Sequence, residues 1–134
     1  MNAEVFLLDS SAIMTYLEDE EGAEYVNTLL FNEIVLMPWS AMMEVYYLTL
    51  QEQGVNIAEQ RYEWLKKLPV TILWEMDEAT LLIAARFKAM HRISFADALI
   101  AGFAAAHNAI LVHKDPEYQA LKGKIQLEPL PYKS

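Results

Sequence analysis

The stretch SFADALIAGFAAAHNAILVHKDPEY, residues 94–118, decides the expected fold. Its Ser94-x-x-Asp97 pattern is typical of a helix start, so we expect a helix to begin at about Phe95. Apart from Asp97, residues 95–106 carry no charge, which predicts a helix enclosed by protein on all sides. Residues 110–112 are typical of a short strand, and Asp115-Pro116 predicts the turn that ends it. The stretch thus predicts one acid at the start of a buried helix and another at the end of a strand.

Three small residues share one face of this predicted helix. Ala98, Gly102 and Ala106 lie four positions apart, and residues at that spacing are neighbours on a helix surface. The flat stripe predicts that a sheet or a second helix packs closely against it. Asp97 is therefore expected to be held on rigid, buried structure.

Length and composition limit the class of protein. A chain of 134 residues is expected to form a single domain over residues 1–134, large enough to bury a core. Apolar residues make up 54% of it, but no continuous run approaches the roughly 18 needed to cross a bilayer, so no membrane association is expected. Cysteine is absent and the start does not resemble a secretion signal, which favours the cytoplasm.

The net charge of −9 is unevenly distributed along the chain. The first 60 residues contain 11 acids and no base, whereas the part from Arg61 onward contains 8 acids and 10 bases. Because nucleic-acid phosphates favour basic surfaces, this balance argues against loose binding to nucleic acid. The run Glu18-Asp19-Glu20-Glu21 is typical of a solvated acidic surface.

Strand and helix patterns alternate along the whole chain, with no repeat or linker between them. Apolar runs closed by a polar or turn residue predict strands at residues 5–8, 34–37, 70–74, 110–112 and, weakly, 125–127. Helical spacing and capping residues predict helices at about residues 12–17, 21–31, 41–53, 57–68, 78–90 and 95–106. The alternation predicts an α/β domain with a mostly parallel sheet.

Two of these helices have an expected inward face made of large apolar residues. In the third helix, which we expect Ser40 to cap and Gly54 to end, the residues predicted to face inward are Met43, Tyr46, Tyr47 and Leu50. Glu44 is expected in the first turn of that helix. In the fourth helix, Trp64 and Leu65 are expected on the apolar side.

Four acids are predicted to meet at one edge of the sheet. Asp9 ends the first strand and Asp115 follows a late one, and the reactive crevice of an open parallel sheet lies beyond the carboxyl ends of its strands. Glu44 and Asp97 lie near the starts of helices that begin at the same edge. All four side chains are therefore expected to converge.

Such a cluster predicts a bound metal ion. Four ionised acids a few ångströms apart repel one another, and a fold tolerates this only with protonation or a bound cation. Oxygen-only ligands favour Mg²⁺ or Mn²⁺ over zinc. Carboxylate clusters that hold such ions are a known means of cleaving phosphodiesters, because the metal activates a water and offsets charge on the leaving oxygen.

Four motifs together resemble the PIN domain family. They are Asp9-Ser10-Ser11 after an apolar strand, Glu44 in the helix after the second strand, Ser94-x-x-Asp97-Ala98-Leu99-Ile100-Ala101, and Leu111-Val112-x-x-Asp115-x-Glu117-Tyr118. The match spans nearly the whole chain, and the order and spacing of four acids make it specific. Within that family, the length resembles the VapC ribonuclease toxins of type II toxin–antitoxin systems.

The resemblance implies a three-layer α/β/α domain and a Mg²⁺- or Mn²⁺-dependent endoribonuclease. It assigns the metal-binding and catalytic roles to Asp9, Glu44, Asp97 and Asp115, and supporting roles to Ser11, Ser94 and Glu117 as an outer ligand. His113 stands where the family commonly has Thr or Ser. The resemblance also implies an RNA substrate, a cognate antitoxin whose tail blocks the metal site, and a homodimer with an apolar self-contact around Tyr46 and Trp64. Given the acidic balance, we expect selective cleavage of a folded RNA, with Arg86, Lys88, Arg92 and Lys114 along the approach.

Other interpretations stay open at this point. Each acid alone has a structural explanation: a helix cap for Asp9 and Asp97, a turn for Asp115, and a helix-dipole acid for Glu44. A catalytically inactive PIN-fold module that binds a basic partner peptide is the main alternative function. A receiver-like phosphoacceptor domain requires adjacent acids after the first strand, but here Asp9 is followed by serines. A phosphatase with an Asp-x-Asp nucleophile requires a second acid at position 11, where this chain has Ser11.

Overall fold

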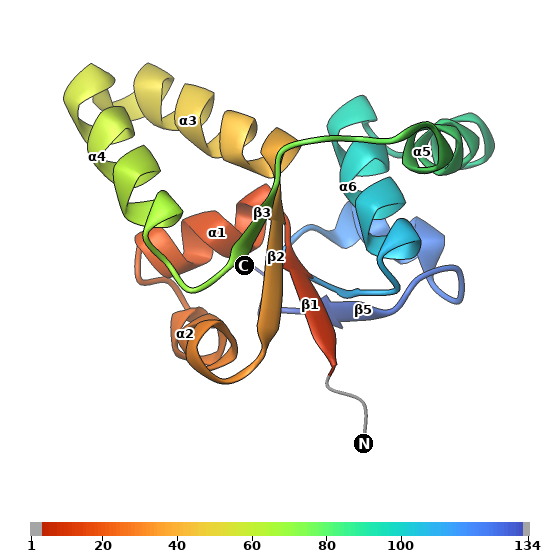
Figure 1. Ribbon diagram of the computed structural model, residues 1–134, viewed down its shortest axis with the longest axis horizontal. Helices are drawn as coiled ribbons and strands as arrows, with labels where there is room; N and C mark the ends of the chain where they lie inside the picture. Colours follow the sequence, from red (N-terminus) through yellow and green to blue (C-terminus); the bar gives the residue numbers. More distant parts are fainter. Residues whose placement is uncertain (1–3, 133–134) are drawn as a thin grey trace.

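The computed structural model describes residues 4–132 as a parallel sheet between two layers of helices (Figure 1). Five parallel strands run in the order β3-β2-β1-β4-β5, with helices α1 to α4 on one side and α5 and α6 on the other. The elements are β1 (Val5–Leu8), α1 (Ser10–Leu17), α2 (Ala23–Asn32), β2 (Ile34–Pro38), α3 (Trp39–Gln53), α4 (Val55–Lys66), β3 (Thr71–Leu73), α5 (Glu78–Met90), α6 (Phe95–Ala106), β4 (Ile110–His113), the 3-10 helix η1 (Pro116–Leu121) and β5 (Leu127–Pro129). The expected α/β/α fold with a parallel sheet is confirmed.

The two strands that carry the predicted acids are neighbours in the middle of the sheet. Leu7 of β1 pairs in register with Leu111 of β4, and neither is exposed to solvent. Both strands are apolar runs because helices cover both of their faces. The backbone N–H of Asp9 donates to the carbonyl of Val112 at 3.2 Å, so the carboxyl ends of β1 and β4 are joined directly.

The small-residue stripe on α6 packs against α5, as expected for a close helix contact. A Cβ added to Gly102 would lie 2.7 Å from the Cβ of Ala84 on α5, so only glycine fits there at this helix separation. Burial on α6 is nearly complete from Asp97 to Ala104. The expectation of enclosure on all sides is wrong at the ends, where Phe95 and Ala106 are exposed.

The expected inward face of α3 is wrong. Pro38, not Ser40, is the N-cap residue, and the helix begins at Trp39, which places Glu44 in the second turn. The buried residues are small or flexible: Ala41, Met42, Val45 and Thr49. The residues that were expected inside but are exposed are Met43, Tyr47 and Leu50 on α3 and Trp64 on α4. Apolar side chains occur on both faces of α3. The face with the smaller side chains is the buried one, because α3 lies close to the sheet and to α1.

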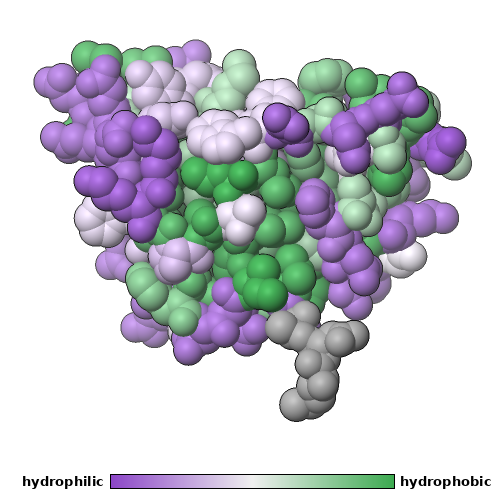
Figure 2. Space-filling view, viewed as in Figure 1, coloured by the Kyte–Doolittle hydropathy of each residue, from purple (hydrophilic) through white to green (hydrophobic). Residues whose placement is uncertain are grey.

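Smaller boundary differences have local causes. Helix α4 begins at Val55, directly after Gly54, whose φ of +91° lets the chain reverse between α3 and α4. Strand β5 is Leu127–Pro129, two residues later than expected. An apolar area lies over the β2–β3 edge of the sheet, between the polar surfaces of α4 and α5 (Figure 2). Among residues 4–132, no helix has the length and apolar character needed to span a bilayer.

Candidate metal centre

Asp9 lies at the end of β1 and caps helix α1. Its Oδ1 accepts the backbone N–H of Ala12 at 2.8 Å and the Ser11 hydroxyl at 2.7 Å, and the residue is only 2% exposed. Burial raises the pKa of the Asp9 carboxyl to about 7, even though these hydrogen bonds lower it. The negative charges of Asp115 and Glu44 raise it further. A carboxyl held at this position is therefore costly to ionise without a neighbouring cation.

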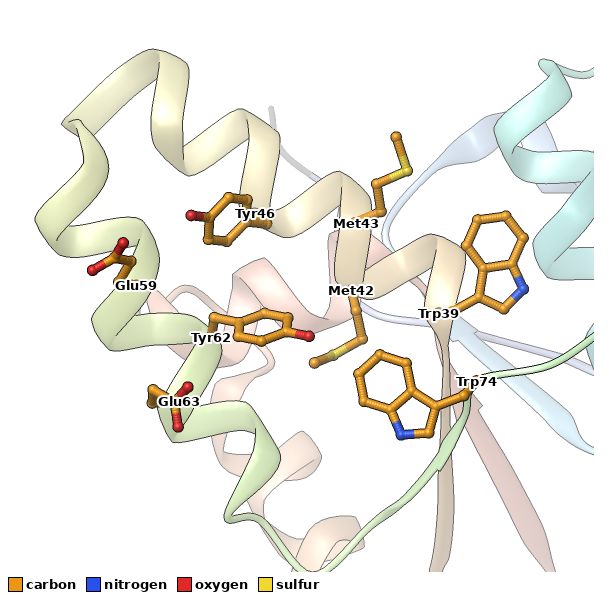
Figure 3. A pocket seen from close by; sticks show the side chains of 8 residues that line it. All are labelled: Trp39, Met42, Met43, Tyr46, Glu59, Tyr62, Glu63 and Trp74. Carbon is orange, nitrogen blue, oxygen red and sulfur yellow. The ribbon is translucent and has the colours of Figure 1, made fainter.

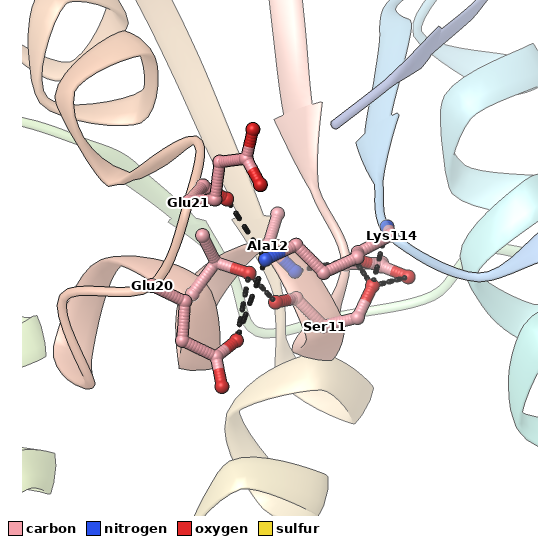
Figure 4. A network of polar contacts seen from close by, with 7 residues as sticks. Ser11, Ala12, Glu20, Glu21 and Lys114 are labelled. Atoms are coloured by element: carbon pink, nitrogen blue, oxygen red, sulfur yellow. Dashed lines mark hydrogen bonds and ion pairs between the residues drawn. The ribbon is translucent and has the colours of Figure 1, made fainter. Parts of the chain in front are cut away.

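The Ser11 hydroxyl connects the first acid to the end of β4. It donates to Asp9 and accepts the backbone N–H of Lys114 at 2.8 Å (Figure 4). The Lys114 amine donates to the carbonyl of Glu21 at 2.8 Å and pairs with Glu20 at 3.4 Å. Lys114 is thus engaged with the α1–α2 connection, and it also lines the pocket that adjoins Asp115.

Three further acids form a compact group on α6 and η1. Asp97, Asp115 and Glu117 each offer a carboxylate oxygen, and these oxygens all lie within 4.8 Å of one another. Asp97 is in the first turn of α6, where its backbone N–H donates to the Ser94 hydroxyl at 3.1 Å. Asp115 caps η1 by accepting the N–H of Glu117 at 2.9 Å, and this turn carries Glu117 back toward Asp97.

The ionisation of this group is strongly uneven. Burial raises the pKa of Asp97 to about 9, and the hydrogen bond to Glu117 and the charge of Asp115 act in the same direction. The hydrogen bond from Asp97 lowers the pKa of Glu117, with further contributions from Ser94 and from the Lys88 charge. Asp97 therefore holds a proton that it donates to the Glu117 carboxylate, as expected where two acids share one site.

Glu44 completes the cluster from α3. The Ser10 hydroxyl donates to its Oε1, which anchors the α3 side chain to the start of α1. Its charge acts on Asp9, as does that of Asp115. Among the described residues, the structure brings together Asp97, Asp115 and Glu117, whereas Asp9 and Glu44 lie outside that 4.8 Å group and act on the cluster through their charges.

Two contributors to the cluster were missed from the sequence. Ser10 has no role in the sequence prediction beyond its place in the Asp9-Ser10-Ser11 motif, yet its hydroxyl donates to Glu44, 34 positions away. Tyr118 is completely buried, and its hydroxyl donates to Asp97 Oδ1 at 3.0 Å. Burial raises the pKa of Tyr118 well above its usual range, so the phenol is a donor. Neither contact has a local signal, because each joins residues far apart in the chain.

The donor set fits a hard divalent cation. All five side chains are carboxylates, which suit Mg²⁺ or Mn²⁺, and the chain contains no cysteine. Burial, and to a smaller extent the neighbouring acids, raise the pKa values of Asp9 and Asp97, so both carboxylates are costly to ionise without a cation. His113 is not placed as a ligand, because its Nδ1 accepts the backbone N–H of Asp115 at 3.1 Å.

Two pockets lie near these elements. One of about 440 Å³ adjoins the acids and is lined by Ser11, Met14, Glu18, Glu20, Glu52, Lys114, Asp115, Pro116 and Tyr132. A second, of about 600 Å³, lies between α3, α4 and the segment after β3 (Figure 3). It is aromatic and acidic, with Trp39, Met42, Met43, Tyr46, Glu59, Tyr62, Glu63 and Trp74 as its lining. The first pocket gives solvent access to the acidic cluster.

The fold and this acidic cluster define a PIN domain. The family model for the PIN domain matches residues 6–124, and the chain belongs to this family. Among solved structures, the fold is similar to that of VapBC2 from Rickettsia felis bound to a promoter DNA fragment, with a TM-score of 0.78 and 16% identity over 95% of this chain and 99% of the other.

Further structures share the same fold. VapBC-1 from nontypeable Haemophilus influenzae has a TM-score of 0.74 and 22% identity over 93% of this chain and 97% of the other. VapC20 of Mycobacterium tuberculosis, a sarcin–ricin loop cleaving toxin, has a TM-score of 0.68 and 14% identity over 87% and 94% of the two chains. No curated protein matches the sequence.

Proposed function

We propose that this chain is a Mg²⁺- or Mn²⁺-dependent endoribonuclease and the toxin of a toxin–antitoxin pair. The observation that carries the proposal is the convergence of Asp97, Asp115 and Glu117 within 4.8 Å, beside Asp9 and Glu44. Membership of the PIN family supports nuclease chemistry. The RNA-cleaving activity named for VapC20, a protein of the same fold, supports RNA as the substrate.

In this proposal Asp9, Glu44, Asp97 and Asp115 bind the ion, and Glu117 belongs with them rather than outside. A bound divalent ion supplies an activated water and charge stabilisation at the leaving oxygen. The chain itself fixes the ligands: Ser11 and the Ala12 N–H orient Asp9, and Ser10 orients Glu44. These contacts preorganise the carboxylates before RNA arrives. The proton that Asp97 holds beside Glu117 in the metal-free chain leaves when these acids bind the ion, because metal ligands must be deprotonated.

The charge of the chain limits which RNA is cleaved. A net charge of −9 opposes loose binding to phosphate backbones. We therefore propose selective cleavage of a folded RNA recognised by shape. Equal degradation of unrelated single strands at physiological salt would contradict this part of the proposal.

The test is a cleavage assay on the purified chain with structured RNA, in Mn²⁺ and in EDTA. The wild type is expected to cleave only with the metal. Asp97→Asn is expected to lose more than about 100-fold in rate, since even outer-shell partners of metal sites contribute 10- to 100-fold. Asp77→Asn is the control, because Asp77 is likewise an acid at the start of a helix, the N-cap of α5, but is exposed and outside the cluster. Equal cleavage rates for the wild type, Asp97→Asn and Asp77→Asn would refute the proposed chemistry.

The proposal includes two protein partners in the cytoplasm. A basic antitoxin tail is complementary to the pocket beside the cluster, which Glu18, Glu20, Glu52 and Asp115 make acidic. A homodimer is proposed through α3 and α4, whose exposed apolar side chains include Met43, Tyr47 and Trp64. Sedimentation at micromolar concentration tests the self-contact, and a monomer there would contradict it.

The strongly acidic balance favours one alternative, an inactive PIN-fold module that binds a basic peptide. The same variants separate the two functions. The alternative gains if Asp97→Asn abolishes partner binding while no cleavage is detected for the wild type in Mn²⁺.

A further inference from the structure

Tyr118 contacts the acidic cluster from inside the hydrophobic core. Its side chain is fully buried among core residues, and its hydroxyl donates to Asp97 Oδ1 at 3.0 Å. Within the described residues, this is the hydrogen bond that satisfies the phenol. Because a buried hydroxyl without a partner is costly, the Tyr118 ring and the Asp97 carboxylate constrain each other.

A second buried ring holds Tyr118 in place. The ring centroids of His113 and Tyr118 are 4.9 Å apart with a 59° tilt, and His113 has no exposed surface. His113 is itself fixed, because its Nδ1 accepts the backbone N–H of Asp115. Two buried aromatic residues therefore contact the cluster. Tyr118 donates to the Asp97 side chain, and His113 accepts from the Asp115 backbone.

We propose that Tyr118 is a positioning residue that fixes the Asp97 carboxylate in its metal-binding orientation. The inference rests on the proposed function, because it assumes that Asp97 binds the ion. A carboxylate offers about four acceptor sites over its two oxygens, so one bond to Tyr118 leaves the others available. Hydrogen bonds behind a metal ligand set its orientation, and their loss weakens metal binding.

The structure supplies an isosteric variant and a matched control. Tyr118→Phe removes the hydroxyl and leaves the ring packed against His113. Tyr25→Phe also removes a tyrosine–carboxylate hydrogen bond, the 2.6 Å bond to Glu128, but at an exposed site on α2. A loss found only in Tyr118→Phe is therefore specific to the acidic cluster.

The experiment measures the Kd for Mn²⁺ of the full chain by calorimetry, at a temperature where circular dichroism shows every variant folded. Tyr118→Phe is expected to bind Mn²⁺ about 10-fold more weakly, whereas Tyr25→Phe binds like the wild type. In the RNA assay, kcat is expected to fall while KM changes little. In an Asp97→Ala background, Tyr118→Phe is expected to cause no further loss, since the contact is already absent.

The outcomes separate this role from the proposed function. A wild type that binds no Mn²⁺ overturns the metal site and the role of Tyr118 together. A wild type that binds Mn²⁺, with Tyr118→Phe binding equally well, overturns only the role of Tyr118. A further tenfold loss in the Asp97→Ala background also overturns it, because Tyr118 would then act through another group.

Discussion

Replacing Asp9 with Asn is expected to stabilise the chain in EDTA at alkaline pH. Asp9 is almost completely buried, and burial raises its pKa from 3.8 to about 7. Asn fills nearly the same space and caps helices as well as Asp does, so the start of α1 is preserved. The substitution removes a charge that the fold stabilises poorly.

The size of the effect follows from the pKa of Asp9. Between pH 3.8 and about 7 the folded chain holds a proton that the unfolded chain has released, so the free energy of unfolding falls as pH rises. At about 1.4 kcal/mol per pKa unit, the loss reaches roughly 4 kcal/mol above pH 7. The Asn amide weakens the bond with Ser11, at a cost of about 1–2 kcal/mol. We therefore expect a net gain of about 2 kcal/mol at pH 8 and none at pH 4.

Urea unfolding at pH 4 and pH 8 in EDTA measures this difference. Asp77→Asn is the control, since Asp77 is an exposed N-cap whose pKa is lowered by hydrogen bonds from Thr80, and it should show no gain at pH 8. Adding Mn²⁺ at about 100 times its Kd should stabilise the wild type by about 2.7 kcal/mol. The wild type should then be more stable than Asp9→Asn at pH 8. A variant less stable than wild type at pH 8 in EDTA, by the same amount as at pH 4, would refute the reasoning.

Two further substitutions test the supports of the site. Gly102→Ala places a Cβ 2.7 Å from the Ala84 Cβ and 3.1 Å from its backbone, so we expect a loss of about 1–3 kcal/mol in urea unfolding, and an unchanged midpoint would contradict this packing. Ser11→Ala leaves the Lys114 N–H without its acceptor and removes one of the two donors to Asp9, so we expect a loss of about 1–3 kcal/mol and weaker Mn²⁺ binding in calorimetry. Wild-type values for both quantities would show that the Ser11 bridge is unimportant.

The features that the sequence predicted well depend on short-range contacts. Asp9 accepts from Ala12, and Ser94 accepts from Asp97, each three positions away, so the residue types alone indicate the geometry. The apolar runs of β1 and β4 predicted central strands because both of their faces are covered. The general rule that the carboxyl ends of parallel strands meet at one edge predicted that Asp97 and Asp115 lie close together, and these two are in the observed group.

The features that were missed depend on long-range packing. Helix α3 has apolar side chains on both faces, so its periodicity did not show that Met42 faces the core and Met43 faces solvent. Met43 lines the aromatic pocket between α3 and α4, and this pocket depends on how α4 folds back after Gly54. Glu117 was placed outside the cluster because the turn of η1, which carries it to Asp97, is not apparent from composition.

Asp9 and Asp77 show why a local pattern alone does not identify such a site. Both are helix N-caps, and each accepts the backbone N–H of the residue three positions on. The pKa of Asp77 is lowered, as expected for an exposed carboxylate that only caps a helix. The pKa of Asp9 is raised, because the same cap is buried and faces other acids. Asn would cap α1 without that electrostatic cost, so helix capping alone does not explain the acid at position 9.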